Sequence, residues 1–559
     1  IEELSKLVDI QGKDRRRFKR LREESRSFDS LPIRTRLSDE EVARFSAQRY
    51  RFPGVEIKAR LFRQYPFGEL ASHVIGYIGR INAKEKERIE EEDESGNYRG
   101  NEYIGKLGVE LKYERELHGI TGVNRVETSA GGRATRSLSS RQAIPGQNVV
   151  LSIDIQLQKL VEDLFGNRRG ALVALDPNTG EVLAFVSKPT FDPNLFVEGI
   201  DVENWQALNE SPDKPLLNRA LRGTYPPGST YKPFMALAAL ETGARTAGTV
   251  INDPGFWMFG NHRFRSHGDA GLGAVDMHRS IVKSSNTYYY SLANEMGVDR
   301  MHDFMKPLGF GQITGIDLKG EVRGVLPNQE WKRRTYKRPE QQKWYSGETI
   351  SLGIGQGYNN FTMLQLAHAM ATLANGGIRH TPHLTLATEN VLTRQRNPLG
   401  SSAPVNLGYK RENIDVILRA MQSVTTEGTS TRVFAGAGYE SGGKTGTAQA
   451  VTIGQKDRYD ARKLEEHQRD HALYIAFAPV KEPRVALAVV VENAGFGAAH
   501  AAPIARRVFD YLLLDQYPNP EDLKAVQRGQ AAAPIGTPLK ASGMPWPPEA
   551  QLTSPATAP

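Results

Sequence analysis

The chain of 559 residues contains no cysteine, which excludes disulfides, cysteine nucleophiles and thiolate metal sites. Hydrophobic residues make up 39% and charged residues 24% of the sequence, the balance of a globular protein with a sizeable core. The formal net charge of +8 is spread along the chain without an aromatic and basic nucleotide motif. It fits an acidic surface or polymer nearby, and we expect no nucleic-acid partner.

The first third of the sequence predicts mixed elements. Residues 13–24 form a dense charge run, which we interpret as a solvated helix face. Ser38 followed by Glu41 is typical of a helix start with a capping box. Residues 50–80 alternate in the manner of strands, and residues 104–118 favour a helix.

A boundary and a new set of elements follow. Residues 127–147 are rich in Ser, Gly, Arg and Thr and end near Pro145-Gly146, which indicates a domain boundary. Residues 149–153 predict a strand, and residues 155–165 predict a helix.

Strand-like runs at both ends of the next segment enclose a long, mostly helical stretch. Residues 171–175 and 181–187, joined by Asp-Pro-Asn-Thr-Gly, predict a β-hairpin. Residues 472–478 and 485–491 are two later strands. This order predicts an α/β domain whose antiparallel sheet is built from both ends of the segment. From residue 518 the sequence is rich in Pro and Ala without periodicity, and we expect a disordered tail.

Three short motifs carry side chains suited to acyl transfer. They are Ser229-Thr230-Tyr231-Lys232, Ser284-Ser285-Asn286 and Lys444-Thr445-Gly446-Thr447. Each pattern is weak alone, because Ser-x-x-Lys also begins at Ser211, Ser280 and Ser441.

The context of Ser229 separates it from these other serines. A Pro-Pro-Gly turn precedes Ser229, and the small and apolar run 234–240 follows it. This pattern predicts a buried helix with Ser229 at its N-terminus and Gly243 near its end. Pro233 is tolerated there because it falls in the first helical turn.

The spacing of the first motif suggests a nucleophile and its base. Positions i and i+3 share a helix face, so the Lys232 amine can reach the Ser229 hydroxyl. Serine needs a neighbouring base, and a lysine serves only when burial or a second cation such as Lys444 disfavours its charged form. We therefore predict a neutral Lys232, and an oxyanion hole formed by the backbone N–H groups of Ser229 and Thr447.

The other two motifs supply relay and substrate-binding groups. Ser284 would relay a proton, and the Asn286 amide would orient the substrate. Lys444-Thr445-Gly446 would lie on a strand at the edge of a cleft, where Lys444 and Thr445 can hold a carboxylate. Gly446 would let a substrate backbone approach closely.

The three motifs in this order resemble the penicillin-binding protein and serine β-lactamase superfamily. Residues 315–318, 326–332, 347–357 and 469–471 are similar to the monofunctional, elongation-type penicillin-binding protein 2 of Gram-negative bacteria. The likeness runs from about residue 40 to about residue 515.

This resemblance implies a multi-domain α/β protein. Residues 1–148 would be an elongated α+β, non-catalytic pedestal that is truncated at its start. Residues 149–517 would be a transpeptidase domain with a five-stranded antiparallel sheet flanked by helices, and residues 518–559 the tail. The sequence contains no apolar run of the roughly 18 residues that a membrane span needs and no signal peptide. The resemblance implies a single-pass inner-membrane anchor before the pedestal, outside this sequence, and a catalytic domain in the periplasm.

The resemblance also implies a reaction and its partners. Ser229 would be acylated by the D-Ala–D-Ala end of a stem peptide, and an amine of a second stem peptide would take the acyl group during lateral wall elongation. β-Lactams would acylate the same serine, and no cofactor is implied. A membrane glycosyltransferase of the SEDS family and a rod-complex scaffold are the implied protein partners.

A possible metal cluster is the main competing feature. The stretch 253–278 contains Asp253, His262, His267, Asp269, Asp276 and His278. Such a cluster can bind zinc, and some relatives hold zinc beside the Ser-x-Asn motif with Asp, Asp, His and Cys. Of those positions only Asp253 is kept here, and the others are Ser266, Leu272 and Ser285. We expect no metal.

Three rival functions share the motifs. A serine β-lactamase or β-lactam sensor would differ in its rate of deacylation, although the length of the region before residue 149 argues against it. A DD-carboxypeptidase or endopeptidase would use water as acceptor and differ in its product. A non-enzymatic scaffold of wall synthesis would not be acylated at all.

Overall fold

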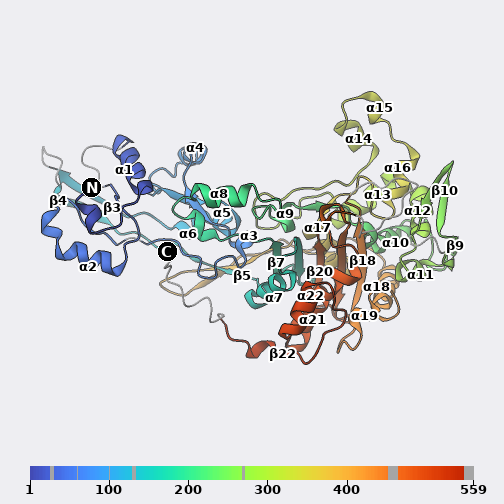
Figure 1. Cartoon of the computed structure of the whole chain (residues 1–559). Helices are drawn as coiled ribbons and strands as arrows, with labels where there is room; N and C mark the ends of the chain where they lie inside the picture. Colours follow the sequence, from blue (N-terminus) through green and yellow to red (C-terminus); the bar gives the residue numbers. More distant parts are fainter. Residues whose placement is uncertain are drawn as a thin grey trace. The chain divides into compact units, whose positions relative to one another are not determined.

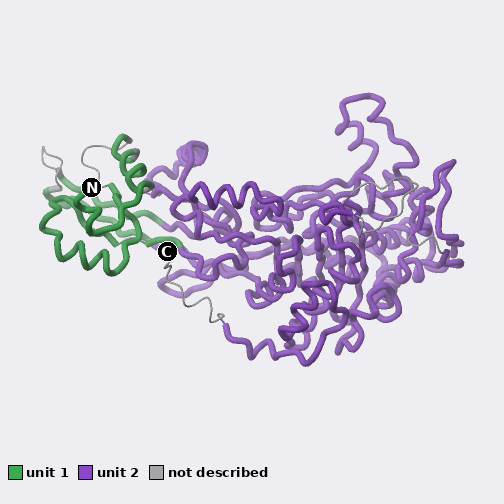
Figure 2. Tube along the Cα trace, viewed as in Figure 1, with its two compact units in different colours: residues 1–63, 120–144 green, residues 64–119, 145–559 purple. Residues whose placement is uncertain are grey.

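The chain folds as two compact units, which are described separately. A computed structural model (Figure 1) describes residues 1–24, 31–59, 61–99, 101–128, 134–266, 271–450 and 464–546. Unit 1 comprises residues 1–63 and 120–144, and unit 2 comprises residues 64–119 and 145–559 (Figure 2). The compact units therefore divide the chain differently from the predicted boundary at residue 148.

Unit 1 combines short helices with one hairpin. Its elements are η1 (Leu4–Lys6), α1 (Gly12–Glu24), α2 (Asp39–Ala47), η2 (Arg49–Arg51) and the antiparallel pair β3 (Val123–Thr128) and β4 (Ala134–Arg141). The predicted capping box is confirmed, because the Ser38 side chain accepts from Glu41 N while the Glu41 carboxylate accepts from Ser38 N. The predicted helix at 13–24 is also present, although Asp14 is buried and pairs with Arg17 and Arg34.

Unit 2 begins with short elements that differ from the sequence predictions. They are α3 (Ser72–Ile75), β1 (Ile78–Arg80), α4 (Ala83–Glu91), β2 (Tyr103–Gly105), α5 (Gly108–Lys112) and α6 (Glu114–His118). The prediction of strands over 50–80 is wrong except at β1, because Pro53, Pro66 and Gly68 interrupt the alternation. The predicted helix at 104–118 is two short helices that meet at Tyr113.

A five-stranded antiparallel sheet organises the rest of unit 2. Its order is β18 (Gly442–Ala448), β19 (His471–Ala478), β20 (Val485–Val491), β6 (Gly170–Leu175) and β7 (Val182–Lys188). Every neighbouring pair is antiparallel. The prediction that strands from both ends of the segment form one sheet is therefore confirmed, and β18 is an edge strand.

Unit 2 contains further helices and short strands outside this sheet. The helices are α7 (Ile155–Phe165), α8 (Val202–Asn209), α9 (Arg219–Arg222), α10 (Lys232–Glu241), α11 (Met277–Val282), α12 (Asn286–Met296), α13 (Val298–Met305), α14 (Gln329–Thr335), α15 (Pro339–Gln342), α16 (Ser346–Leu352), α17 (Met363–Ala374), α18 (Arg411–Thr426), α19 (Thr431–Phe434), α20 (Gly497–His500), α21 (Ala502–Leu514) and α22 (Pro520–Gln527). The single-turn helices are η3 (Pro193–Phe196), η4 (Gly228–Tyr231), η5 (Lys306–Leu308), η7 (Glu466–Gln468) and η8 (Ala541–Gly543). The smaller strands are β5 (Asn148–Leu151), β8 (Thr224–Tyr225), β9 (Ile251–Asp253), β10 (Phe256–Phe259), β11 (His262–Arg265), β12 (Gly273–Val275), β13 (Phe361–Thr362), β14 (Ile378–Arg379), β15 (Thr385–Glu389), β16 (Arg396–Pro398), β17 (Val405–Asn406), β21 (Gln516–Tyr517) and β22 (Leu539–Lys540).

Both faces of the sheet are buried. On β6, Val173 belongs to the core that includes α10, α12, α17 and α18, whereas Leu172 belongs to the core that includes α7 and α21. Successive side chains of a strand point to opposite faces, so helices must cover each face. This explains why β6, β19 and β20 are almost continuously apolar. None of the helices among the described residues is both long and apolar enough to cross a membrane.

The structure of the C-terminal segment differs from the sequence prediction. The prediction of disorder from residue 518 is wrong as far as residue 546, because α22 packs beside α7. Asn519 caps α22, and Asp522 forms a fully buried ion pair with Arg507 of α21. Breaking such a pair leaves an uncompensated buried charge, so this segment is held firmly. Residues 547–559 lie outside the described residues.

Candidate active site

The first motif lies where a tight turn enters a buried helix. Ser229 is partly exposed in η4, and Lys232 begins α10, whose side chains are almost all buried. The prediction of a buried helix is confirmed, although Ser229 lies in the single-turn helix just before it. Gly228 has a φ of +54°, and a Cβ there would lie 2.5 Å from Thr447 O. Glycine therefore lets the serine turn pack against β18.

The second motif surrounds the amine of Lys232. Its Nζ donates to Ser284 O at 2.8 Å, to Ser284 Oγ at 3.2 Å and to Asn286 Oδ1 at 2.6 Å. The Lys232 side chain is fully buried. Ser284 holds a left-handed conformation with a φ of +57°, which is unfavourable for a residue with a Cβ. This conformation gives Lys232 both the carbonyl and the hydroxyl of the same residue.

The third motif completes the cluster from the edge strand. Lys444 Nζ donates to Ser284 Oγ at 2.8 Å and to Thr445 O at 3.1 Å. Lys444 is fully buried and lies on β18, as predicted. The Ser284 hydroxyl thus bridges the two lysine amines, and the structure brings the three motifs together.

Burial perturbs both lysines, and at Lys232 the charge of Lys444 adds to the effect of burial. Burial and the nearby Lys444 cation lower the pKa of Lys232 well below its usual value, against an opposing effect of Asp253. Burial lowers the pKa of Lys444 to about 7. Both buried amines therefore lose their protons more readily than an exposed lysine does, and the nearby Lys444 charge adds to this effect at Lys232.

The backbone of β18 lies against the serine turn. Gly446 also has a role in packing, because a Cβ there would lie 2.7 Å from Thr230 Cγ2 and 3.1 Å from Pro227 O. Glycine at this position permits the packing of η4 on β18. The partly exposed Thr445 shares a hydroxyl hydrogen bond of 2.8 Å with Thr429, and Thr447 is also partly exposed.

Residues missed by the sequence analysis brace this arrangement. Gln356 Nε2 donates to Thr447 O at 3.1 Å, and Gly228 N donates to Gly355 O at 2.9 Å. The loop after α16 therefore ties the serine turn to β18. No local pattern marks Gln356 or Thr429 as part of the site, because their partners are distant in sequence.

Asp253 is hydrogen-bonded to the second motif and to the helix that begins there. Its buried carboxylate accepts from Ser285 Oγ at 2.6 Å, from Thr287 Oγ1 at 2.7 Å and from Gly255 N at 2.8 Å. These donors use three of the roughly four lone pairs through which the carboxylate could bind a cation, and Ser285 donates to Asp253. His262 and His278 are exposed, and no group of three or more potential metal ligands occurs among the described residues. His267 and Asp269 lie outside them.

The other Ser-x-x-Lys matches lack this environment. Ser280 is buried, and its hydroxyl donates to Met277 O within α11. Ser441 is buried at the start of β18, where positions i and i+3 lie on opposite faces of the strand. Ser211 lies in a turn, where its hydroxyl accepts from Asp213 N.

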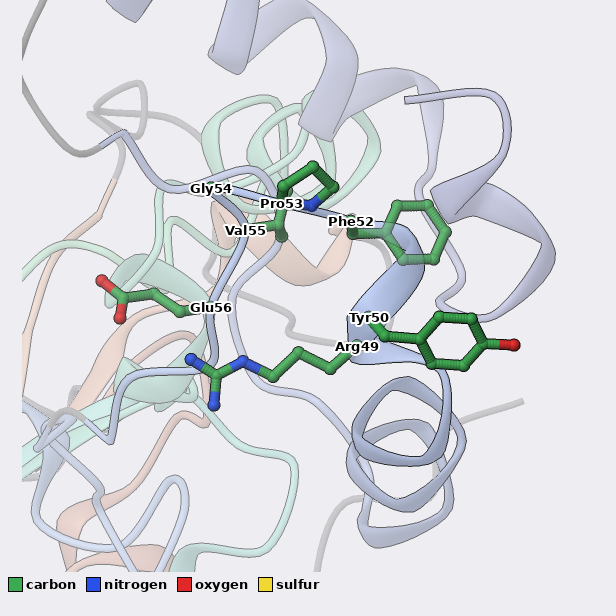
Figure 3. A pocket seen from close by; sticks show the side chains of 7 residues that line it. All are labelled: Arg49, Tyr50, Phe52, Pro53, Gly54, Val55 and Glu56. Carbon is green, nitrogen blue, oxygen red and sulfur yellow. The ribbon is translucent and has the colours of Figure 1, made fainter.

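A hollow in unit 1 is unsuited to acyl transfer. It is lined by Arg49, Tyr50, Phe52, Pro53, Gly54, Val55 and Glu56. Figure 3 shows the Tyr50 and Phe52 rings pointing away from Glu56. The lining offers no serine and no buried amine.

Comparison with known families agrees with the site. The model of the penicillin binding protein transpeptidase domain matches residues 170–510, and that of the penicillin-binding protein dimerisation domain matches residues 1–151. The chain belongs to the penicillin-binding protein family. Its sequence similarity to curated relatives shows that it belongs to the penicillin-binding protein 2 group. It is a serine-type peptidoglycan D,D-transpeptidase.

Relatives and solved structures span most of this penicillin-binding protein. Peptidoglycan D,D-transpeptidase MrdA of Haemophilus influenzae is 40% identical over 93% of this chain and 80% of the relative. The MrdA protein of Acinetobacter baumannii is 42% identical over 93% and 76%. The structure of Pseudomonas aeruginosa PBP2 in complex with WCK 5153 superposes with a TM-score of 0.70 at 40% identity, covering 82% of this chain and 92% of that one. PBP2 of Helicobacter pylori in complex with MreC gives a TM-score of 0.76 at 28% identity, covering 91% of both chains.

Proposed function

We propose that Ser229 cross-links stem peptides during lateral wall elongation through an acyl-enzyme, with neutral Lys232 as its base. The observation that carries this proposal is the buried Lys232 amine, held between Ser284 and Asn286 with a second lysine across the Ser284 hydroxyl. A buried amine near a cation loses its proton readily and becomes a base.

Each step is assigned to groups of this cluster, in which Ser229 lies one helical turn before Lys232. Ser229 Oγ attacks the D-Ala–D-Ala carbonyl while its proton passes to Lys232 Nζ. The backbone N–H groups of Ser229 and Thr447 would stabilise the oxyanion, since Gly228 and Thr447 lie in contact. The C–N bond then breaks, and terminal D-Ala leaves with a proton delivered through Lys232 and Ser284.

Lys444 and Thr445 would hold the terminal carboxylate of the donor, and Asn286 would orient its backbone. The amine of a second stem peptide then attacks the ester, gives up a proton to Lys232 and releases Ser229. A β-lactam enters the same sequence and stops at the ester.

The test compares products from one incubation. Purified protein mixed with uncross-linked glycan strands is expected to yield cross-linked dimers. Trimmed monomers alone would indicate a carboxypeptidase or endopeptidase, and rapid turnover of penicillin would indicate a β-lactamase. Failure of a fluorescent penicillin to label the folded protein would support a scaffold.

The pH profile of acylation tests the two lysine roles. The second-order rate constant for a β-lactam should rise with pH as Lys232 loses its proton, and fall through the pKa of about 7 at which Lys444 loses its own. In Lys444→Met the descending limb should disappear. The rising limb should move to higher pH, because the cation that lowers the pKa of Lys232 is gone.

A matched control for this profile is Lys283→Met, which removes an exposed lysine beside Ser284 whose amine bonds only to Glu427 O among the described residues. It should leave both limbs in place. A rising limb that stays fixed or moves to lower pH in Lys444→Met would contradict the assigned coupling.

The domain layout and cellular setting are part of the same proposal. We infer that residues 1–148 form a non-catalytic pedestal and that residues 149–517 carry catalysis in the periplasm behind a single-pass anchor. The H. pylori relative forms a complex with MreC, and a further relative, 30% identical, belongs to a peptidoglycan synthase complex. By likeness, a rod-complex scaffold and a SEDS-family glycosyltransferase would be the partners here.

A further inference from the structure

A basic projection stands out among the parts of unit 2 that the proposed mechanism does not use. Residues 329–345 contain α14, α15 and the turns beside them, and are called the basic arm. Figure 1 shows α14 and α15 extending away from α16 and the body of unit 2. The arm carries cations at Lys332, Arg333, Arg334, Lys337, Arg338 and Lys343, against acids at Glu330 and Glu340.

The base of the arm is rigidly built. Lys332 is buried, and its amine donates to both oxygens of Glu348, with 2.6 Å to Oε2. The rings of Trp344, Tyr345 and Tyr358 surround that amine at 5.4 to 5.7 Å. Tyr358 also donates to the Glu348 carboxylate. These contacts pair the Lys332 charge with Glu348, so this lysine has a structural role. They also fix the base of the segment that carries the other cations.

The outer cations of the arm are free to bind a ligand. Arg333, Lys337 and Arg338 are exposed, and their side chains have no ion pair or hydrogen bond within the described part of the chain. Arg334 has only a loose pair with Glu330 at 3.5 Å, with both side chains exposed. Exposed cations without acidic partners create a positive field that attracts anions.

The arm is connected to the active site by a short path. Its C-terminal end leads directly into α16, whose packing partner α12 begins with Asn286. The loop after α16 contacts the serine turn through Gly355 and the edge strand through Gln356. The basic arm and the loop that braces Ser229 therefore flank the same helix, α16.

We propose that the basic arm binds the carboxylates of stem peptides along an uncross-linked glycan strand and so concentrates donor and acceptor peptides near Ser229. This inference rests on the proposed function, because that reaction requires a strand whose donor peptides end in D-Ala carboxylates. Repeated carboxylates along a strand match several guanidinium and ammonium groups on one projection. The weak individual contacts add up because they belong to one polymer.

The test is a charge-reversal variant of the basic arm, assayed both with polymeric glycan strands and with a fluorescent penicillin. The variant Arg333→Glu, Lys337→Glu, Arg338→Glu should cross-link polymeric strands on the order of 10-fold more slowly at low salt, because the field that concentrates them is lost. Acylation of Ser229 by a fluorescent penicillin should stay within about twofold of the unchanged protein. The difference in cross-linking should shrink near 1 M salt, where the Debye length is about 3 Å.

Two further variants serve as controls. Lys84→Glu, Arg99→Glu, Arg528→Glu makes the same charge change at exposed positions elsewhere in unit 2, and should cross-link at the normal rate. Arg333→Lys with Arg338→Lys keeps the charge and should retain most of the rate.

The outcomes separate this inference from the proposed function. Failure of penicillin to acylate the protein without substitutions would contradict the proposed function itself. Normal acylation with equal cross-linking by the arm variant and the control would overturn the inference alone. It would also be overturned if the arm variant cross-links normally but loses binding to phosphatidylglycerol vesicles, which would assign the arm to a lipid surface.

Discussion

Replacing Lys232 by alanine is expected to lower the rate constant for acylation by a β-lactam by about 10²–10⁴-fold, the usual contribution of a positioned general base. The side chain is fully buried and is the residue that lies one helical turn from Ser229. Without it, the Ser229 proton has no acceptor of suitable pKa. Stopped-flow measurement with a fluorescent penicillin gives the rate constant directly.

The Lys232→Arg variant distinguishes a base from a structural cation. Arginine carries a permanent positive charge and does not lose its proton in proteins, so it should be about as inactive as alanine. Lys283→Ala, which removes an exposed lysine just after α11 and beside Ser284, should retain the normal rate. Substantial activity in Lys232→Arg would show that charge rather than proton transfer is required.

Replacing Ser229 by alanine is expected to abolish cross-linked dimers and leave the fold intact. The Ser229 side chain is partly exposed and forms no hydrogen bond with another described residue. Its loss should therefore change the free energy of unfolding by no more than about 0.5 kcal/mol. Dimers are counted by chromatography of digested product, and unfolding is followed by circular dichroism.

The matched control is Ser211→Ala, which alters another Ser-x-x-Lys pattern in a surface turn. It should form dimers at the normal rate. Residual dimer formation by Ser229→Ala would require a different nucleophile.

Local sequence patterns predicted many of the helices and strands. The helix at 155–165 and the paired strands of the sheet follow from hydrophobic periodicity and turn residues, which act within a few positions. The capping box at Ser38 is likewise local. These features needed no knowledge of distant partners.

The parts that were missed depend on contacts distant in sequence. The C-terminal segment is fixed by the pair between Asp522 and Arg507, which compositional bias does not reveal. Residues 64–119 belong to unit 2 through contacts such as Ala71 N with Glu162 Oε1 at 3.0 Å. The alternation over 50–80 was misleading because it lacks strand partners.

The candidate active site shows the same difference between features set by local sequence and features set by distant contacts. Its residue types and order could be read from the sequence, but the conformation that makes them work could not. The left-handed Ser284 and the role of Gly446 in packing the serine turn both arise from the approach of separate segments.

Mass spectrometric mapping of the adduct formed on the unaltered protein by a β-lactam tests the central claim most directly. A single adduct on the peptide that contains Ser229 is the predicted result, since this partly exposed serine lies one helical turn before the buried amine of Lys232, whose pKa is lowered. An adduct on Ser211, Ser280 or Ser441, with Ser229 unmodified, would contradict the account.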